Sequence, residues 1–179
     1  MDCLKSPDIP TYYLKPGEIH FTTTPSRILT ILGSCVSLVM YYRPRRIGAI
    51  CHAMMPTMVD LRKEVDPSRR FQYVDGCLEW MISRFEHLHI KRQSIEIKLF
   101  GGAGLFPDRR GGEQSLAVGE RNIEMALKLI DKYGLRLKAW DVGGDKGRKL
   151  IFCTTSGEVL TKFVERTQVP EQPLKEGMR

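Results

Sequence analysis

The stretch ILTILGSCVSLVMYYRPRRIGAICHAMMP, residues 28–56, contains two long apolar runs separated by a Gly-Ser-Cys corner and a third run after a basic segment. The runs at 28–32, 36–42 and 47–55 are rich in β-branched and aromatic residues, which favours strands. Pro44 lies in the RPRR segment between the last two runs and is typical of a turn. Residues 28–56 therefore predict successive strands, and we expect the last two to form a hairpin.

The register of this hairpin decides whether a cysteine and a histidine meet. If residues 43–46 form the turn, the simplest register places Ser37 opposite His52, and Cys35 opposite Met54. Because side chains alternate between faces with a period of two, these four then share one face. Cys35 and His52 become diagonal neighbours with Cα atoms about 7–8 Å apart. A slip of one residue would place them on opposite faces.

A cysteine beside a histidine is a possible nucleophile and base. The thiolate is the reactive form of a thiol, whose ordinary pKa is about 8.5. An imidazole can accept the thiol proton and later protonate a leaving group. Gly33 permits a tight turn, and the N–H groups around Ser34 and Cys35 would face a developing oxyanion. Spacing alone leaves a second interpretation open, in which Cys35 is a buried apolar residue and His52 a hydrogen-bonded core histidine.

Composition excludes several classes of protein. A chain of 179 residues with 42% hydrophobic residues predicts one globular domain. No run approaches the roughly 18 apolar residues of a membrane span, and the N-terminal residues lack the apolar region of a secretory signal. The five cysteines lack CxxC spacing, so we expect no disulfide framework and no zinc site. Free thiols in a reducing cytosol are the corresponding expectation.

The net charge of +7 raises the question of nucleic-acid binding. The basic residues are dispersed among acidic ones and match no nucleic-acid-binding motif, so we expect none. A preference for acidic protein surfaces fits the charge equally well. The loop 57–70, with Arg62, Lys63, Arg69 and Arg70, is a candidate docking rim, although a solvated loop is the simpler interpretation.

The remainder of the chain predicts a mixed α/β domain. A helix is expected over 71–88, with Val74, Leu78, Met81, Phe85 and Leu88 on one face, and another over 114–133, with Ile123, Leu127 and Ile130 on one face. Further strands are expected at 95–102, 136–144, 148–155 and 158–164. The predicted domain spans 17–166, between a flexible lead-in at 1–16 and a flexible tail at 167–179.

Five blocks of this chain, in order, are similar to the signature blocks of a known family. They are LGSCVSLVMY, CHAMMP, KLFGGAGLF, GERNIEMAL and DVGGDKGRKLIF. They resemble the bacterial chemoreceptor glutamine deamidase family, CheD, from about Pro16 to Val164. The resemblance implies a cytoplasmic amidohydrolase that converts selected glutamines of methyl-accepting chemotaxis receptors to glutamate. It implies no cofactor, no metal and no membrane insertion, and a possible partner in a chemotaxis phosphatase of the CheC type.

The resemblance also implies the site residues and the fold. The family's cysteine and histidine fall on Cys35 and His52, and its threonine falls on Thr30, whose hydroxyl would orient the imidazole. Gly33, Ser34, Gly101 and Gly102 are expected to line the substrate cleft. The family's fold, shared with the deamidating cytotoxic necrotising toxins, implies two packed mixed sheets with helices on the outside, in α/β/β/α layers.

Two departures and two glycine clusters remain. Gly104 stands where the family often has Asn, and Cys51 precedes His52 where Asn is frequent, so both positions bear on substrate choice. The clusters at 101–104 and 143–147 match neither phosphate-binding motif, which argues against nucleotide binding. We expect GGDKG to form a turn that lets strands approach closely.

Two rival functions stay open: a non-catalytic adaptor for a chemotaxis phosphatase or receptor, and another thiol amidohydrolase such as a crosslinking enzyme or a peptidase.

Overall fold

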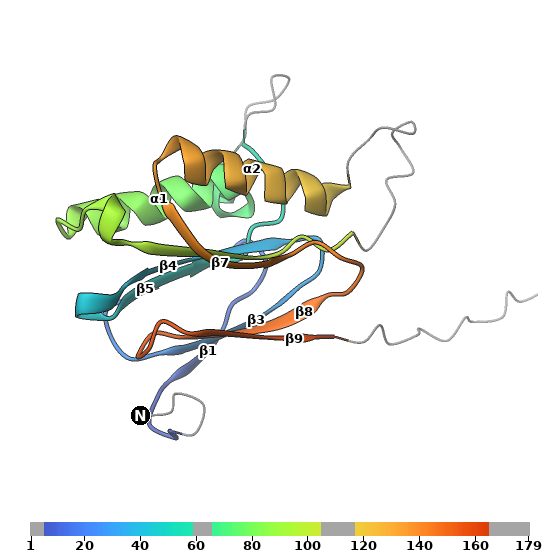
Figure 1. Ribbon diagram of the computed structural model, residues 1–179. Helices are drawn as coiled ribbons and strands as arrows, with labels where there is room; N and C mark the ends of the chain where they lie inside the picture. Colours follow the sequence, from blue (N-terminus) through green and yellow to red (C-terminus); the bar gives the residue numbers. More distant parts are fainter. Residues whose placement is uncertain (1–5, 59–65, 105–116, 165–179) are drawn as a thin grey trace, which may run out of the picture.

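The computed structural model describes residues 6–58, 66–104 and 117–164. Within them the chain forms two β-sheets and two α-helices (Figure 1). The strands are β1 (Thr11–Tyr13), β2 (Ile19–Thr22), β3 (Arg27–Leu32), β4 (Val36–Tyr42), β5 (Ile47–Cys51), β6 (Glu96–Gly101), β7 (Arg136–Val142), β8 (Arg148–Cys153) and β9 (Val159–Phe163). The helices are α1 (Val74–His87) and α2 (Val118–Lys132), with 3₁₀ turns at Arg43–Arg45, Pro67–Gln72 and Arg92–Ser94.

Both sheets are mixed. The four-stranded sheet has the order β1-β3-β8-β9, and the five-stranded sheet has the order β2-β5-β4-β6-β7. The β1–β3 and β6–β7 pairs are parallel, and the other neighbouring pairs are antiparallel. The prediction of a mixed α/β domain with two mixed sheets is therefore confirmed.

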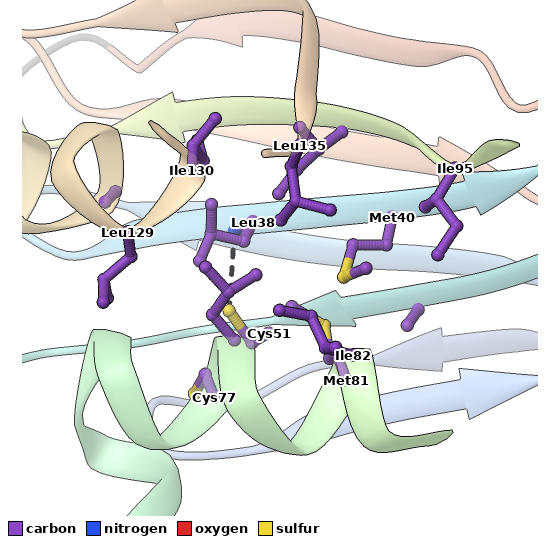
Figure 2. Close-up of a cluster of buried hydrophobic side chains, with 14 of the residues drawn as sticks. Leu38, Met40, Cys51, Cys77, Met81, Ile82, Ile95, Leu129, Ile130 and Leu135 are labelled. Atoms are coloured by element: carbon purple, nitrogen blue, oxygen red, sulfur yellow. Dashed lines mark hydrogen bonds between the residues drawn. The ribbon is translucent and has the colours of Figure 1, made fainter. Parts of the chain in front are cut away.

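Strand β4 lies at the centre of the five-stranded sheet and is buried on both faces. Leu38 and Met40 face the helices, in the cluster drawn in Figure 2. Val39 and Tyr41 face the four-stranded sheet. A strand covered on both sides needs apolar residues at consecutive positions, which accounts for the unbroken apolar sequence of β4.

The expected four-layer order is wrong for the described residues. Both helices pack on the five-stranded sheet, and the opposite side of the four-stranded sheet carries no described helix (Figure 1). The layers are therefore helices, five-stranded sheet and four-stranded sheet. The sequence of the four-stranded sheet agrees with this arrangement, because β3 and β8 alternate buried residues with exposed ones such as Ile31 and Lys149.

The described part of the segment expected as a flexible lead-in, residues 1–16, contributes to the fold. Residues 11–13 form β1, which pairs in parallel with β3. Leu14 is only 4% exposed and belongs to the core between the sheets. The run TYY is too short to show a strand periodicity, which is why β1 was not predicted. The tail at 167–179 lies outside the described residues.

The predicted face of α1 is confirmed, whereas that of α2 is only partly right. Val74, Leu78, Met81 and Phe85 of α1 are fully buried. On α2, Leu127 is 43% exposed, and the helix instead buries Asn122 and Ala126 together with Leu129 and Ile130. The face is rotated because the first turn of α2 lies directly against Gly102, where Gly119 leaves room for the chain.

The cysteines differ in state. Cys35, Cys51 and Cys77 are free, and the last two are buried in the core, Cys77 on α1 and Cys51 on β5 (Figure 2). Cys153 is disulfide-bonded, so the expectation of free thiols is wrong for this residue. In the described part of the chain, no helix is long and apolar enough to cross a membrane.

Substitution of Phe152 tests the packing between the two sheets. Phe152 is fully buried and meets the ring of Tyr41 edge-on, with ring centroids 6.2 Å apart. We expect Phe152→Ala to lower the free energy of unfolding by about 3–5 kcal/mol, because it leaves a cavity between the sheets. The matched control is Phe163→Ala, whose ring is 58% exposed beneath the Arg148 guanidinium and whose loss should cost about 1 kcal/mol or less. Urea denaturation measures both, and equal losses would contradict the described packing.

Candidate active site

The predicted hairpin register is confirmed. Val39 pairs with Ile50 and Met40 with Ala49. The same register continues past the end of β5, where Val36 and Ala53 exchange two backbone hydrogen bonds of 2.9 Å. Cys35 and His52 immediately precede this bridged pair. They are therefore diagonal neighbours on the face of the five-stranded sheet that meets the four-stranded sheet.

Thr30 lies on the facing strand, β3, and joins the histidine. Its Oγ1 atom is 2.8 Å from Nδ1 of His52 and 2.9 Å from the carbonyl oxygen of Leu14. A carbonyl oxygen only accepts hydrogen bonds, so the Thr30 hydroxyl donates to Leu14. The Thr30 oxygen is then the acceptor for His52, which requires the proton of the neutral imidazole to be on Nδ1. This tautomer leaves Nε2 as a free base.

Burial keeps the imidazole neutral. His52 is 3% exposed, and this burial lowers its pKa below the ordinary value, against smaller raising effects from the Leu14 carbonyl and the Glu18 carboxylate. An imidazole that is neutral at physiological pH is available as a proton acceptor.

The cysteine is partly accessible. Cys35 has intermediate exposure. Burial raises the pKa of the Cys35 thiol, and the backbone N–H of the same residue opposes this effect. Among the described residues, no hydrogen bond joins its Sγ to His52. The two groups are therefore both neutral at rest, and the thiolate requires transfer of the thiol proton to a base.

Three donors from other segments hold the carbonyl groups of the corner that precedes β4. Ala103 N–H donates to Gly33 O and Gly102 N–H to Cys35 O, each at 2.8 Å. The carbonyl of Ser34 accepts a bond of 3.0 Å from the Asn122 side chain. Within the described ranges, the amides of Ser34 and Cys35 donate to no backbone carbonyl, so they are the available donors beside the thiol.

Gly101 and Gly102 are buried behind the corner. Both have positive φ, 101° and 69°, and a Cβ on Gly101 would clash with the carbonyl oxygen of Cys35. Only glycine combines this backbone conformation with so close an approach. Buried Arg148 donates to Gly101 O at 2.7 Å and to Gly143 O at 2.9 Å, which fixes the loop from the far side.

The structure thus joins Thr30 to His52 and places Cys35, in the corner with Gly33 and Ser34, diagonally beside His52. Gly101 and Gly102 lie behind this corner. That Gly33, Ser34, Gly101 and Gly102 contact a substrate stays a prediction. The spacing of residues in the sequence did not indicate Leu14, Asn122 or Arg148. Each of them is hydrogen-bonded to a group that is distant in sequence. Asn122 lies off the predicted apolar face of its helix, so periodicity did not single it out.

The expected docking rim is only partly described. Arg62 and Lys63 lie outside the described residues, whereas Arg69 is exposed. Arg70 donates to Gly76 O and lies 3.6 Å from the Glu79 carboxylate, so it supports the start of α1.

The two departures from the family blocks differ in their surroundings. At Gly104 an added Cβ would meet, among the described residues, the Gly144 carbonyl oxygen at 3.8 Å, which is an ordinary contact distance. Cys51 is fully buried, and its Sγ accepts a bond of 3.5 Å from Leu38 N–H (Figure 2). In GGDKG, Gly143 and Gly144 supply positive φ, and close approach is needed only at Gly147, beside Leu32 O.

Comparison with known proteins identifies the family of this chain. A family model described as CheD chemotactic sensory transduction matches residues 54–163. The chain belongs to the CheD family. A Geobacter sulfurreducens protein named probable chemoreceptor glutamine deamidase CheD 2 is 42% identical over 92% of this chain and 96% of its own length. Two further relatives are named probable chemoreceptor glutamine deamidase CheD. The Maridesulfovibrio salexigens protein is 36% identical over 89% of this chain and 95% of its own length. The Methanococcus maripaludis protein is 32% identical over 83% of this chain and 92% of its own length.

The lowered pKa of His52 predicts a pH dependence of stability. Below about pH 6.5 the unfolded chain takes up a proton at this residue that the folded protein resists, so the free energy of unfolding falls as the pH decreases. We expect His52→Gln to reduce the loss of stability between about pH 7.5 and pH 5.5, as measured by urea denaturation at both. The pKa of His20 is also lowered by burial, so the same measurement on His20→Gln gives the contribution of that residue to the loss of stability. An unchanged pH dependence in His52→Gln would show that His52 protonates freely in the folded protein.

Proposed function

We propose that this chain is a protein-glutamine glutaminase that converts glutamine side chains of chemoreceptors to glutamate. The observation that carries the proposal is the Thr30–His52 hydrogen bond of 2.8 Å, beside a partly accessible cysteine. It is supported by family membership and by the names of relatives that match most of the chain. The substrates are the cytoplasmic helices of methyl-accepting receptors, so the protein acts in the cytoplasm in chemotaxis adaptation.

The first half of the reaction forms a thioester. His52 Nε2 accepts the proton of the Cys35 thiol, and the sulfur attacks the carboxamide carbon of the glutamine. The negative charge that develops on the amide oxygen is stabilised by the N–H groups of Ser34 and Cys35. The tetrahedral intermediate then collapses, the C–N bond breaks, and the imidazolium donates its proton so that ammonia leaves.

The second half regenerates the enzyme. His52, neutral again, accepts a proton from a water molecule that attacks the thioester carbon. The C–S bond breaks, and the proton returns to the cysteine. The products are glutamate and ammonia. Thr30 holds the imidazole in the required tautomer throughout, whereas Gly101 and Gly102 hold the corner that presents Cys35.

Several finer assignments form part of the same proposal. The catalytic domain begins before the expected residue 17, because Leu14 O is the acceptor that orients the Thr30 hydroxyl. The fold corresponds to that of the deamidating cytotoxic necrotising toxins, with helices on one side only in the described part of the chain. A phosphatase of the CheC type is a further partner. The reaction as written uses no cofactor or metal, and the protein binds no nucleic acid.

Deamidation of receptor fragments tests the proposed function. Mass spectrometry of fragments incubated with the wild-type protein should show glutamines converted to glutamates. Cys35→Ala and His52→Gln should lower the rate by at least about 10³-fold. Thr30→Val, which keeps the side-chain shape, should lower it about tenfold or more, whereas Thr30→Ser should retain most activity.

Two results would contradict the proposal. Equal deamidation by the wild-type protein and Cys35→Ala would exclude the nucleophile, and the absence of deamidation on cognate receptors would exclude the activity. Crosslinked or cleaved fragments would instead indicate a different thiol enzyme, since deamidation neither joins nor cuts chains.

A further inference from the structure

A single amide bridges the two segments that carry the proposed nucleophile and base. Asn122 of α2 is completely buried. Its Nδ2 atom donates to the carbonyl oxygens of Ser34 and Met54, each at 3.0 Å. Ser34 immediately precedes Cys35, and Met54 lies two residues after His52. The side chain therefore fixes one segment against the other.

The orientation of this amide follows from its partners. A primary amide has two N–H donors on its nitrogen, and both carbonyl oxygens of the main chain require donors. The reverse orientation would turn Oδ1 against two other oxygens. Nδ2 therefore faces the two segments, and Oδ1 faces away from them.

The other end of the amide is not satisfied in the described part of the chain. Among the described residues, Oδ1 of Asn122 has no hydrogen-bond partner although it is buried. A buried acceptor without a partner destabilises the folded state, so the two bonds that Nδ2 donates to Ser34 O and Met54 O come with a cost at Oδ1. In native proteins a buried polar atom without a partner calls for an explanation, and a functional role is one of them.

The helix that carries Asn122 is itself positioned against the corner. Gly119 lies one turn before Asn122 and packs against the backbone of Gly102, where a Cβ on either glycine would clash. Gly102 in turn donates to Cys35 O at 2.8 Å. The helix, the 101–102 loop and the corner are therefore packed together, which places the Asn122 amide between Ser34 O and Met54 O.

We propose that Asn122 is a positioning residue of the deamidase, which holds the Cys35 corner at the distance from His52 that proton transfer requires. This inference rests on the proposed function. Asn122 does not touch the reacting atoms and acts through the carbonyls of Ser34 and Met54. Without it, the corner keeps the bonds from Gly102 and Ala103 and the Val36–Ala53 bridge, but it loses the side-chain bridge between Ser34 O and Met54 O. Loss of the amide should lower kcat and leave KM nearly unchanged, because the substrate contacts persist.

Reactivity of Cys35 toward iodoacetamide measures this positioning without a receptor. Peptide mapping reports Cys35 specifically, and Cys51 and Cys77 are fully buried. Asn122→Leu preserves the side-chain volume and removes the donors, and Asn122→Ala is the second variant. The matched control is Ala126→Gly, which weakens α2 by a buried substitution one turn further on and leaves the amide intact.

The expected results separate positioning from stability. At about pH 7.5, Asn122→Leu and Asn122→Ala should alkylate Cys35 about tenfold more slowly than the wild-type protein, and their rates should lose the inflection that His52 produces in the pH profile. Ala126→Gly should alkylate at the wild-type rate. In a His52→Ala background, Asn122→Leu should have no additional effect, because the amide acts only through the histidine.

A wild-type rate and pH profile in folded Asn122→Leu would overturn the inference, as would an effect that adds fully to that of His52→Ala. The proposed function fails separately. If His52→Ala slows alkylation but Asn122→Leu does not, the inference fails and the dyad stands. If His52→Ala leaves alkylation unchanged and no receptor is deamidated, the proposed function fails and the inference fails with it.

Discussion

The hydrogen-bond chain from His52 through Thr30 to Leu14 is the interaction on which the site depends. Thr30 belongs to the four-stranded sheet, whereas His52 follows β5 of the five-stranded sheet. Their bond of 2.8 Å lies between the two layers and is buried on all sides. Relative movement of the sheets would break this bond, so the tautomer of the imidazole depends on how the two sheets pack. A low-dielectric setting of this kind strengthens a satisfied hydrogen bond and penalises a broken one.

A second constraint holds the nucleophile. The corner at 33–35 contributes three consecutive carbonyls, and each is bonded by a different residue from the 102–103 loop or from α2. With its carbonyls held from behind, the corner presents amides and the thiol on its other side. The glycines of the 101–102 loop permit this arrangement by close approach, and Arg148 stabilises that loop through Gly101 O. The packed sheets thus position the base, His52, whereas the 33–35 corner between β3 and β4 carries the nucleophile, Cys35.

Much of this arrangement could be predicted from periodicity and short-range geometry. The β4–β5 register followed from the turn at 43–46, and the apolar face of α1 followed from its spacing. The position of Thr30 opposite His52 could not, because it depends on how one sheet packs on the other. The face of α2 was misjudged at Leu127 because contact with Gly102, distant in sequence, rotates the helix. Strand β1 was missed because its pairing with β3, not its composition, makes it a strand.

The tautomer of His52 is decisive for this site. Proton transfer from Cys35 requires the imidazole proton on Nδ1, donated to Thr30, and an unprotonated Nε2 that can accept the thiol proton. A proton–nitrogen correlation NMR spectrum of the imidazole in the wild-type protein, recorded at about pH 8 where the ring is neutral, distinguishes the two nitrogens. The predicted result is a protonated Nδ1 whose signal depends on the Thr30 hydroxyl and is lost in Thr30→Val. A ring protonated at Nε2 would contradict the account, because His52 would then have no free base to offer Cys35.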